Sequence, residues 1–323
     1  MNQAKPRIAI TMGDPAGVGP EVSLRALANP GLHEIADLRI FGDPAVLDAA
    51  ADATGIPRTD RIVDCKAISL DQFEPGTVNA ATGKAGFTYV DNAITAAKSG
   101  GIDGIVTAPL NKEALHAAGF PYPGHTEIFA EKLASDRFCM MQYSEILSCT
   151  FVTVHVGYAE VPKLITTERI LETIELTREA FLKIRGSDPK IVVLGLNPHA
   201  GEHGLFGDRE EERFIEPAVA EALARGWNIE GPIPPDTAFL KKRLAETDCF
   251  VCMYHDQGHI PVKALAFDKS VNTTLGLRIP RTSVDHGTAL DIAWQGIADP
   301  SSMFEAVKLN VKLLGTAPLG QDI

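Results

Sequence analysis

The chain has 323 residues, of which 45% are hydrophobic, and a formal net charge of -12 at pH 7. This size and apolar content predict a globular protein with a large core, built as two domains or one large α/β unit. The acidic balance argues against nucleic-acid binding, which needs a basic face, and no apolar run reaches the ~18 residues of a membrane span. Residues 1–15 carry no long apolar stretch of a secretion signal, and the five cysteines are irregularly spaced, so we expect a cytoplasmic protein without disulfides.

Short apolar runs alternate with longer segments of helical spacing along the chain. Helical spacing covers residues 81–98, 167–184 and 301–314, and the apolar runs predict strands. The predicted strands are RIAITM, DLRIFG, GIDGIVTA, CTFVTVHV, KIVVLGL and DCFVCMYH. Most of these runs are apolar almost throughout, as expected of parallel strands covered on both faces. The alternation therefore predicts an α/β fold.

The first predicted strand continues into the glycine-rich segment MGDPAGVGPEV. Pro20 and Glu21 are typical of a first helical turn, so the segment predicts a strand, a tight turn and a helix. Exposed amides of such a turn can bind an anion, and a plain connecting turn explains the glycines equally well. Val22 occupies the position of the third glycine in a dinucleotide-binding fingerprint, so this loop does not indicate a Rossmann site.

Three histidines follow apolar runs, in TFVTVHVG, KIVVLGLNPHAG and CFVCMYHDQGH. A single histidine in such a place is usually structural, but His155, His199 and His255 together indicate a metal site at three strand ends. Neutral imidazole suits zinc, cobalt, nickel or iron, and three protein ligands leave positions open for substrate oxygens. Asn197 and Asp256 lie beside two of these histidines and are candidates to orient them.

The same C-terminal region contains several cations and one cysteine pair. Lys263, Lys269, Arg278 and Arg281 fall within one short stretch, where some are expected to bind an anion and others to be solvated surface charges. Cys249 and Cys252 lie three apart in a predicted strand and point to opposite faces. Core packing therefore explains the pair better than metal chelation.

Seven motifs in order give the chain a resemblance to a known family. They are GDPAGVGPE, TAPLNKEAL, GHTE, LGLNPHAGE, YHDQG, VNTTLGL and RTSVDHGTA. Together these motifs resemble the 4-hydroxythreonine-4-phosphate dehydrogenase family of vitamin B6 biosynthesis. The resemblance implies two α/β domains of the isocitrate and isopropylmalate dehydrogenase type, with the active site in the cleft between them. It also implies a homodimer whose subunits share their active sites. The cofactors implied are NAD and one divalent metal ion per site (zinc, cobalt, magnesium or manganese).

The resemblance also implies roles for individual residues. The metal ligands would be His155, His199 and His255, contributed across the dimer. The residues that hold the phosphorylated substrate would be His125, Thr126, Lys263, Asn272 and Arg281. An arginine can bind a phosphate or carboxylate through two parallel hydrogen bonds, which agrees with this assignment. Asp236 and Asp256 are candidates for moving protons or orienting a metal-bound water.

A second resemblance concerns the segment HGTALDIAWQGIADP, residues 286–300. It is similar to the nicotinamide-cofactor loop of isopropylmalate and isocitrate dehydrogenases, which do not use a Rossmann loop. By this likeness His286, Gly287 and Ala289 line the adenosine site, and Asp291 accepts from ribose hydroxyls. A carboxylate there repels a 2'-phosphate and favours NAD, with NADP as the alternative. Without a cofactor role, residues 289–294 would be one face of a buried helix.

We expect a first domain of residues 1–122 and 296–323 and a second domain of residues 123–295. The expected reaction is the oxidation and decarboxylation of a phosphorylated 3-hydroxy acid, with 4-hydroxythreonine 4-phosphate giving 3-amino-2-oxopropyl phosphate. The stretch HIPVK, residues 259–263, and GEHGLFG, residues 201–207, depart from the biosynthetic pattern. They resemble the catabolic branch that acts on D-threonate or D-erythronate 4-phosphate and gives dihydroxyacetone phosphate. The sequence is also compatible with a cis-dihydrodiol dehydrogenase, a metal-dependent hydrolase or a non-catalytic metal-binding relative.

Overall fold

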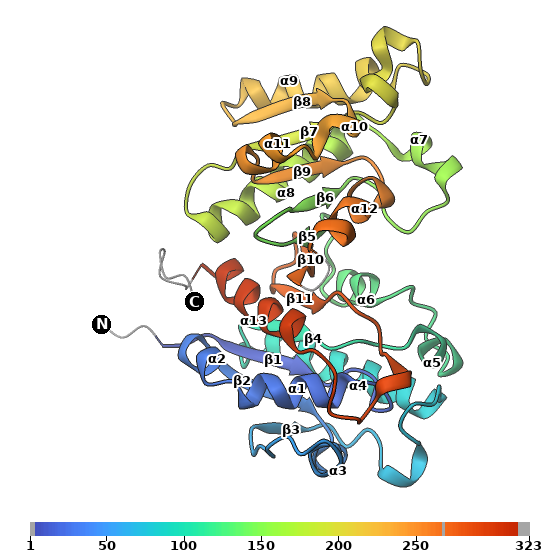
Figure 1. The fold of residues 1–323 in the computed structure, drawn as a ribbon, viewed down its shortest axis with the longest axis vertical. Helices are drawn as coiled ribbons and strands as arrows, with labels where there is room; N and C mark the ends of the chain where they lie inside the picture. Colours follow the sequence, from blue (N-terminus) through green and yellow to red (C-terminus); the bar gives the residue numbers. More distant parts are fainter. Residues whose placement is uncertain (1–3, 267–268, 316–323) are drawn as a thin grey trace. The chain divides into compact units, whose positions relative to one another are not determined.

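The computed structural model describes residues 4–266 and 269–315. The chain forms two compact units (Figure 1). Unit 1 consists of Met1–Asp136 and Leu277–Ile323, and unit 2 of Arg137–Gly276. Both units contain a β-sheet covered by helices, so the predicted α/β fold is confirmed. No helix of the described residues is long and apolar enough to cross a membrane.

Unit 1 contains a parallel sheet with strand order β3-β2-β1-β4-β11. Its elements are β1 (Arg7–Thr11), α1 (Gly19–Ala28), α2 (Pro30–Ile35), β2 (Asp37–Gly42), α3 (Pro44–Thr54), β3 (Ile62–Asp64), η1 (Leu70–Gln72), α4 (Ala80–Lys98), β4 (Gly104–Thr107), α5 (Lys112–Ala117), α6 (His125–Lys132), β11 (Arg281–Val284), η6 (Leu290–Ile292) and α13 (Ser301–Leu313). Strand β4 is buried at every position, as its apolar sequence predicted.

Unit 2 contains a mixed sheet with strand order β10-β5-β6-β9-β7-β8. Its elements are β5 (Cys139–Tyr143), β6 (Cys149–Phe151), η2 (Tyr158–Glu160), α7 (Val161–Leu164), α8 (Thr167–Arg185), β7 (Ile191–Leu194), η3 (Pro198–Gly204), η4 (Glu211–Ile215), α9 (Glu216–Ala224), β8 (Ile229–Ile233), α10 (Pro235–Ala238), α11 (Lys241–Glu246), β9 (Cys249–Cys252), α12 (His255–Ala266) and β10 (Val271–Leu275). Strand β5 runs antiparallel to both neighbours, whereas β6, β9, β7 and β8 are mutually parallel.

Alternating side chains of β7 divide the core of unit 2 into two layers. Val193 packs in a cluster with residues of α8 and α9, whereas Val192 packs in a second cluster with residues of α10 and α12. This alternation follows from the strand period of two. Cys249 and Cys252 are fully buried in β9, so core packing explains the pair, and all five cysteines are free.

The unit boundaries differ from the expected domain boundaries at both crossings. Residues 123–136 belong to unit 1 because Ile128 and Phe129 of α6 pack into its core with residues of α4. Residues 277–295 also belong to unit 1, since β11 pairs in parallel with β4. Most of the Pro- and Gly-rich segment at residues 231–235 belongs to strand β8, inside unit 2.

Candidate active site

In unit 2, the three histidines follow the carboxyl ends of neighbouring parallel strands. His155 follows β6, His255 follows β9, and His199 follows β7, in the spatial order β6-β9-β7. Asp236 follows β8, the next strand of the sheet. The carboxyl ends of parallel strands share one edge of a sheet, where α/β proteins bind ligands. The topology therefore brings four of the predicted site residues to one edge.

His155 and His255 lie close together. Their ring centroids are 5.7 Å apart. Metal to imidazole nitrogen bonds are ~2.0–2.1 Å long, so this separation is compatible with one shared ion. In the part of the chain that the structure describes, however, no group of three or more His, Cys, Asp or Glu side chains is placed to hold a metal. The structure brings two of the three predicted ligands together, and His199 as the third stays a prediction.

Asp256 orients the His255 ring. The His255 Nδ1 atom lies 2.7 Å from Asp256 Oδ1, as expected from their adjacency in the sequence. This contact leaves Nε2 as the ring nitrogen for a metal, and a carboxylate on the other nitrogen is a common arrangement for metal-binding histidines. The donor set on this edge of the sheet therefore fits a divalent ion of the kind that imidazole prefers.

His199 lies in a left-handed turn, η3. His199, Ala200, Gly201, Glu202 and His203 all have φ angles between +43° and +79°. Only glycine adopts this region without cost, and each other L-residue loses ~1–2 kcal/mol there. A turn of this kind persists only when surrounding contacts hold it.

The buried carboxylate of Glu211 supplies those contacts. Its Oε1 accepts hydrogen bonds from the backbone nitrogens of Leu196 at 2.9 Å and Asn197 at 2.8 Å. The Asn197 side chain donates to Glu210 at 2.9 Å and to Glu211 at 3.0 Å. Asn197 was a candidate to orient His199, and its side-chain nitrogen binds these two glutamates rather than the His199 ring. Asn197 and Glu211 instead fix the entry to the turn that carries His199.

Gln257 connects the strand ends that precede His255 and His199. Its Oε1 accepts from Met253 N at 2.6 Å, and its Nε2 donates to Gly195 O at 2.7 Å. Met253 directly follows β9 and Gly195 directly follows β7. Neither Gln257 nor Glu211 was predicted as a site residue, although Gln257 belongs to the YHDQG motif. Glu211 gave no signal, because a glutamate within GDREEERF resembles surface charge.

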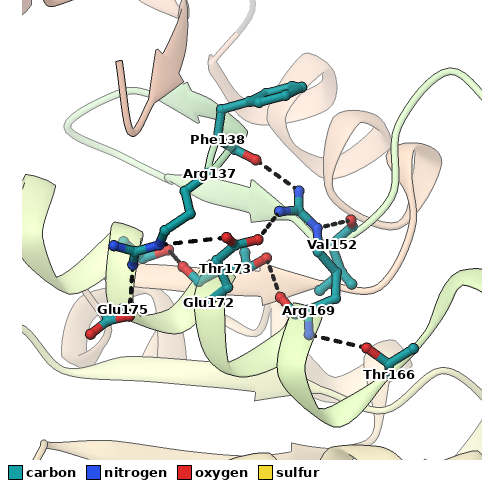
Figure 2. Close-up of polar contacts among 9 residues, drawn as sticks. Arg137, Phe138, Val152, Thr166, Arg169, Glu172, Thr173 and Glu175 are labelled. Carbon is teal, nitrogen blue, oxygen red and sulfur yellow. Dashed lines mark hydrogen bonds and ion pairs between the residues drawn. The ribbon is translucent and has the colours of Figure 1, made fainter. Parts of the chain in front are cut away.

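Arg169 of α8 holds the chain just before His155 (Figure 2). Its Nε donates to Val152 O at 3.1 Å and its Nη2 donates to Phe138 O at 2.9 Å. The guanidinium also pairs with Glu172, which in turn lies 3.5 Å from Arg137. Phe138 precedes β5 and Val152 follows β6, so these contacts fix the chain at one end of this antiparallel pair, and the segment leading to His155 starts from an ordered point.

Helix α12 carries His255, His259 and Lys263 at intervals of four residues, so all three lie along one face. The His259 ring stacks on the His255 ring, with centroids 3.8 Å apart and planes at 17°. Lys263 is half-buried. Asn272 lies on β10, and its Nδ2 is 3.4 Å from Met140 Sδ.

In unit 1, Arg281 is the first residue of β11 and is 2% exposed. Its Nη2 donates to Thr107 Oγ1 at 2.8 Å, and its guanidinium lies over the Phe129 ring. Burial lowers the pKa of Arg281 to about 9, while the charge of Glu127 opposes this change. The guanidinium stays charged at neutral pH, and a bound anion would offset the cost of its burial.

His125, at the start of α6, belongs to the same cluster. Burial lowers the pKa of its imidazole well below the usual value, and the charges of Arg281 and Lys112 lower it further. The ring is therefore neutral at pH 7. Within the described residues its buried Nε2 has no hydrogen-bond partner. A buried polar nitrogen beside a buried cation fits an anionic ligand with oxygen atoms. Thr126, the next residue of α6, is also buried.

The predicted cofactor loop, residues 286–300, docks on the glycine-rich turn after β1. Val18 N donates to Thr288 O at 3.0 Å, and Trp294 Nε1 donates to Pro15 O at 3.0 Å. A Cβ atom at Gly17 would lie 2.7 Å from Thr288 O, so this approach requires glycine. Glu21 accepts from Ala298 N at 3.0 Å. Two motifs that are distant in the sequence thus form one structure.

These contacts also decide between the two interpretations of the glycine-rich turn. Ala16 N donates to Asp14 Oδ1 at 2.9 Å, Gly17 N donates to Asp14 O at 3.1 Å, and Val18 N is taken by Thr288. With these three amides used internally, the structure favours the connecting turn over an anion site. Asp14 itself is 1% exposed, and burial raises its pKa to about 6.

The predicted adenosine residues lie in the first half of the loop. His286 is half-buried with Nδ1 2.9 Å from Gly287 O, Ala289 has a φ of +41°, and Asp291 is exposed in the single turn η6. No residue of η6 is buried, so the expectation that residues 289–294 could form one face of a buried helix is wrong. The exposed carboxylate of Asp291 is available to accept hydrogen bonds from hydroxyl groups.

The comparisons with known proteins cover both units. The family model described as Pyridoxal phosphate biosynthetic protein PdxA matches residues 34–310. The chain is 42% identical over 324 residues to D-threonate 4-phosphate dehydrogenase of Salmonella typhimurium, covering 95% of this chain and 98% of the relative. It is 42% identical over 329 residues to 4-hydroxythreonine-4-phosphate dehydrogenase of Geobacter metallireducens, with 97% of each chain covered. The solved structure of 4-hydroxythreonine-4-phosphate dehydrogenase from Klebsiella pneumoniae is similar with a TM-score of 0.84 at 38% identity, covering 96% of this chain and 100% of that one.

Proposed function

The chain belongs to the Pyridoxal phosphate biosynthetic protein PdxA family, as its motifs predicted, and from this premise we propose that it oxidises and decarboxylates a phosphorylated 3-hydroxy acid. Family membership confirms the prediction of a dehydrogenase. The proposed substrate is 4-hydroxythreonine 4-phosphate, which gives 3-amino-2-oxopropyl phosphate, and the proposed oxidant is NAD.

The observation that carries this proposal is the succession of His155, His255 and His199 at the carboxyl ends of β6, β9 and β7. These imidazoles would hold a divalent cation, with zinc, cobalt, magnesium and manganese as candidates. When bound, the cation would act as a Lewis acid on the substrate hydroxyl. It would do the same for the carbonyl group formed by oxidation, which is present when carbon dioxide is lost. Asp256 fixes the His255 ring, and Glu211 fixes the turn of His199.

Unit 1 supplies the proposed phosphate site. Arg281 contributes a buried charge at neutral pH, His125 contributes a neutral ring with a buried nitrogen, and Thr126 contributes a hydroxyl. Lys263 and Asn272 of unit 2 are proposed as further substrate ligands, since both are half-buried polar residues. An arginine that is already desolvated binds a phosphate more strongly than one that must lose water on binding.

The loop of residues 286–300 is proposed to bind the nicotinamide cofactor, which accepts a hydride. His286, Gly287 and Ala289 would line the adenosine, and Asp291 would accept from the ribose hydroxyls. The exposed Asp291 carboxylate favours NAD over NADP, because it would repel a 2'-phosphate. Asp236 and Asp256 are proposed to move protons, since both are exposed at the edge of the sheet that carries the histidines.

We also propose a cytoplasmic homodimer with shared active sites. Each histidine-bearing segment of unit 2 exposes a large apolar side chain: Tyr158 is 74%, Leu205 69% and Ile260 65% exposed. Apolar side chains next to a site favour coverage by a second copy of the chain. Five free cysteines agree with a reducing compartment.

D-Threonate 4-phosphate is the second candidate substrate, with D-erythronate 4-phosphate beside it. The observation that favours it is the stretch His259-Ile260-Pro261, which departs from the biosynthetic pattern, together with the similarity to a D-threonate 4-phosphate dehydrogenase. An unphosphorylated cis-dihydrodiol is disfavoured, because Arg281 and His125 provide a buried site suited to an anion.

The deciding experiment measures absorbance at 340 nm with NAD, a divalent metal ion and each of the three phosphates. We expect NADH from at least one of them, and kcat/KM identifies the substrate. Absence of NADH from all three phosphates, with metal bound, would refute the dehydrogenase function.

A second experiment tests the metal site. His199→Ala should remove most of the bound metal, and unchanged metal content would contradict the set of three histidine ligands. The matched control is His116→Ala, which removes an exposed histidine of unit 1.

A further inference from the structure

His259 lies between a core phenylalanine and a proposed metal ligand. Its ring stacks on Phe151 of β6, with centroids 4.7 Å apart and planes at 17°. Its other stacking partner is His255, at 3.8 Å and also at 17°. Phe151 is 1% exposed and His259 is 9% exposed, so the stack connects the buried core to the edge of the sheet that carries the histidines.

The backbone of α12 permits this stack because the helix begins directly on the sheet. A Cβ atom added to Gly258 would lie 2.8 Å from Cys252 Sγ, 2.8 Å from a ring carbon of Phe151 and 3.0 Å from Cys149 Cβ. Only glycine allows this approach, which puts the first turn of α12 against β6 and β9. His255 and His259 are four residues apart, so their side chains lie one above the other on the helix.

Nothing in the proposed function assigns a role to His259. Asp256 holds one nitrogen of the His255 ring at 2.7 Å, and a single hydrogen bond still allows the ring to rotate about it. A flat ring packed 3.8 Å from the imidazole restricts that rotation. Because α12 approaches β6 so closely, His259 is itself confined by Phe151.

We propose that His259 is a positioning residue that fixes the plane of the His255 imidazole for metal binding, through the stack Phe151–His259–His255. This inference rests on the proposed metal role of His255. A side chain without a flat ring, such as leucine, fills the same space but does not hold the plane. Residues that orient a metal ligand typically contribute ~10–100-fold to metal affinity.

The test compares Co²⁺ binding to the full-length wild type, His259→Leu and His259→Phe, followed by calorimetric titration and by the visible spectrum of the bound ion. We expect His259→Leu to weaken Co²⁺ affinity by ~10-fold and to change the spectrum, because the geometry of the ligand is no longer fixed. His259→Phe retains a flat ring and should restore both affinity and spectrum to within ~2-fold of the wild type. Thermal unfolding of each variant establishes that the protein is folded.

The outcomes separate this inference from the metal site itself. His255→Ala should abolish Co²⁺ binding, and wild-type affinity in that variant would refute the metal role of His255. If His255→Ala loses the ion while folded His259→Leu binds it with wild-type affinity and spectrum, the positioning role is wrong. Equal losses in the folded leucine and phenylalanine variants would also overturn it, since stacking would then not be the relevant contact.

Discussion

The two units place their proposed functional groups in different ways. Unit 2 carries His155, His199 and His255 in exposed or half-buried segments after its strands, whereas unit 1 buries Arg281 within a strand. Hydrogen bonds accepted by Glu211, Asp256 and Gln257 hold the segments that carry His199 and His255. Arg281 is placed by the sheet itself. The sheet alone therefore fixes the position of Arg281, whereas the proposed histidine ligands need other side chains to orient them.

Removing Arg281 should give the largest effect. Arg281→Ala is expected to weaken binding of the phosphorylated substrate by ~100–1,000-fold, because a desolvated charge partner of the phosphate is lost. Measurement of KM and of the dissociation constant for the substrate checks this. Arg278→Ala, at an exposed position, is the matched control and should change neither value. A similar small effect in both variants would show that the buried arginine does not bind the phosphate.

Loss of Glu211 tests whether the histidines depend on separate anchors. Glu211→Ala leaves two backbone N–H groups, of Leu196 and Asn197, without their acceptor. Each buried unsatisfied donor costs ~1–3 kcal/mol, so we expect a lower free energy of unfolding and metal affinity reduced by ~10-fold or more. Urea unfolding and metal titration measure the two effects. The control Glu216→Ala removes an exposed glutamate that begins α9. Unchanged metal affinity in Glu211→Ala would show that the His199 turn does not need this anchor.

The buried carboxyl of Asp14 accepts a hydrogen bond within the glycine-rich turn of unit 1 and predicts a pH dependence. Its pKa is raised to about 6, above the ordinary value of 3.8. The folded state therefore binds the proton more tightly, so the contribution of Asp14 to stability is full below about pH 4 and is lost as pH rises through about 6. The Asp14→Asn variant does not lose stability in this way, because its amide does not titrate. The difference in free energy of unfolding, variant minus wild type, should increase by ~1–3 kcal/mol between pH 4 and 7. A constant difference would contradict the raised pKa.

The smallest effect is expected for Asp256. This side chain is 68% exposed, so its hydrogen bond to His255 is weakened by solvent. Asp256→Asn should weaken metal affinity by only ~2- to 5-fold, less than the loss in Glu211→Ala. Metal titration measures this effect. A larger loss than in Glu211→Ala would reverse the order of the anchors and indicate that Asp256 contacts the metal or the reacting substrate itself.

The sequence predicted the α/β class and the positions of the long helices because their apolar spacing is regular. The helices α4 and α8 lie within one residue of the predicted ranges. Strands β3, β5, β8, β10 and β11 were not predicted. Gln, Asn, Thr or Ser in β5, β10 and β11, such as Asn272 and Thr274 in β10, and Glu, Gly and Pro in β8 obscure the apolar run. The burial of these polar residues depends on pairing with strands distant in the chain, which local spacing does not report.

The site was predicted only in part for a similar reason. Histidines after apolar runs are visible in a sequence, and the topology places them at one edge of the sheet. Of the residues that orient them, Asp256 was visible beside His255, whereas Glu211 and Gln257 were not, because they act through backbone atoms of other segments. The docking of the predicted cofactor loop on Gly17 likewise joins segments more than 250 residues apart. A contact of this range leaves only an unexplained glycine in the sequence.

The left-handed turn at His199 has a consequence for substitutions in related chains. Glycine at position 199, 200, 202 or 203 would relieve the unfavourable φ angles and stabilise the turn, by up to ~1 kcal/mol at each position that adopts it without loss of contacts. β-Branched residues would be the least tolerated there. His199 itself must remain if it binds metal, so selection for stability and selection for activity act in opposite directions at this one position. Ala200 lies beside it with no such proposed role, and Ala200→Gly would stabilise the protein without removing a proposed ligand.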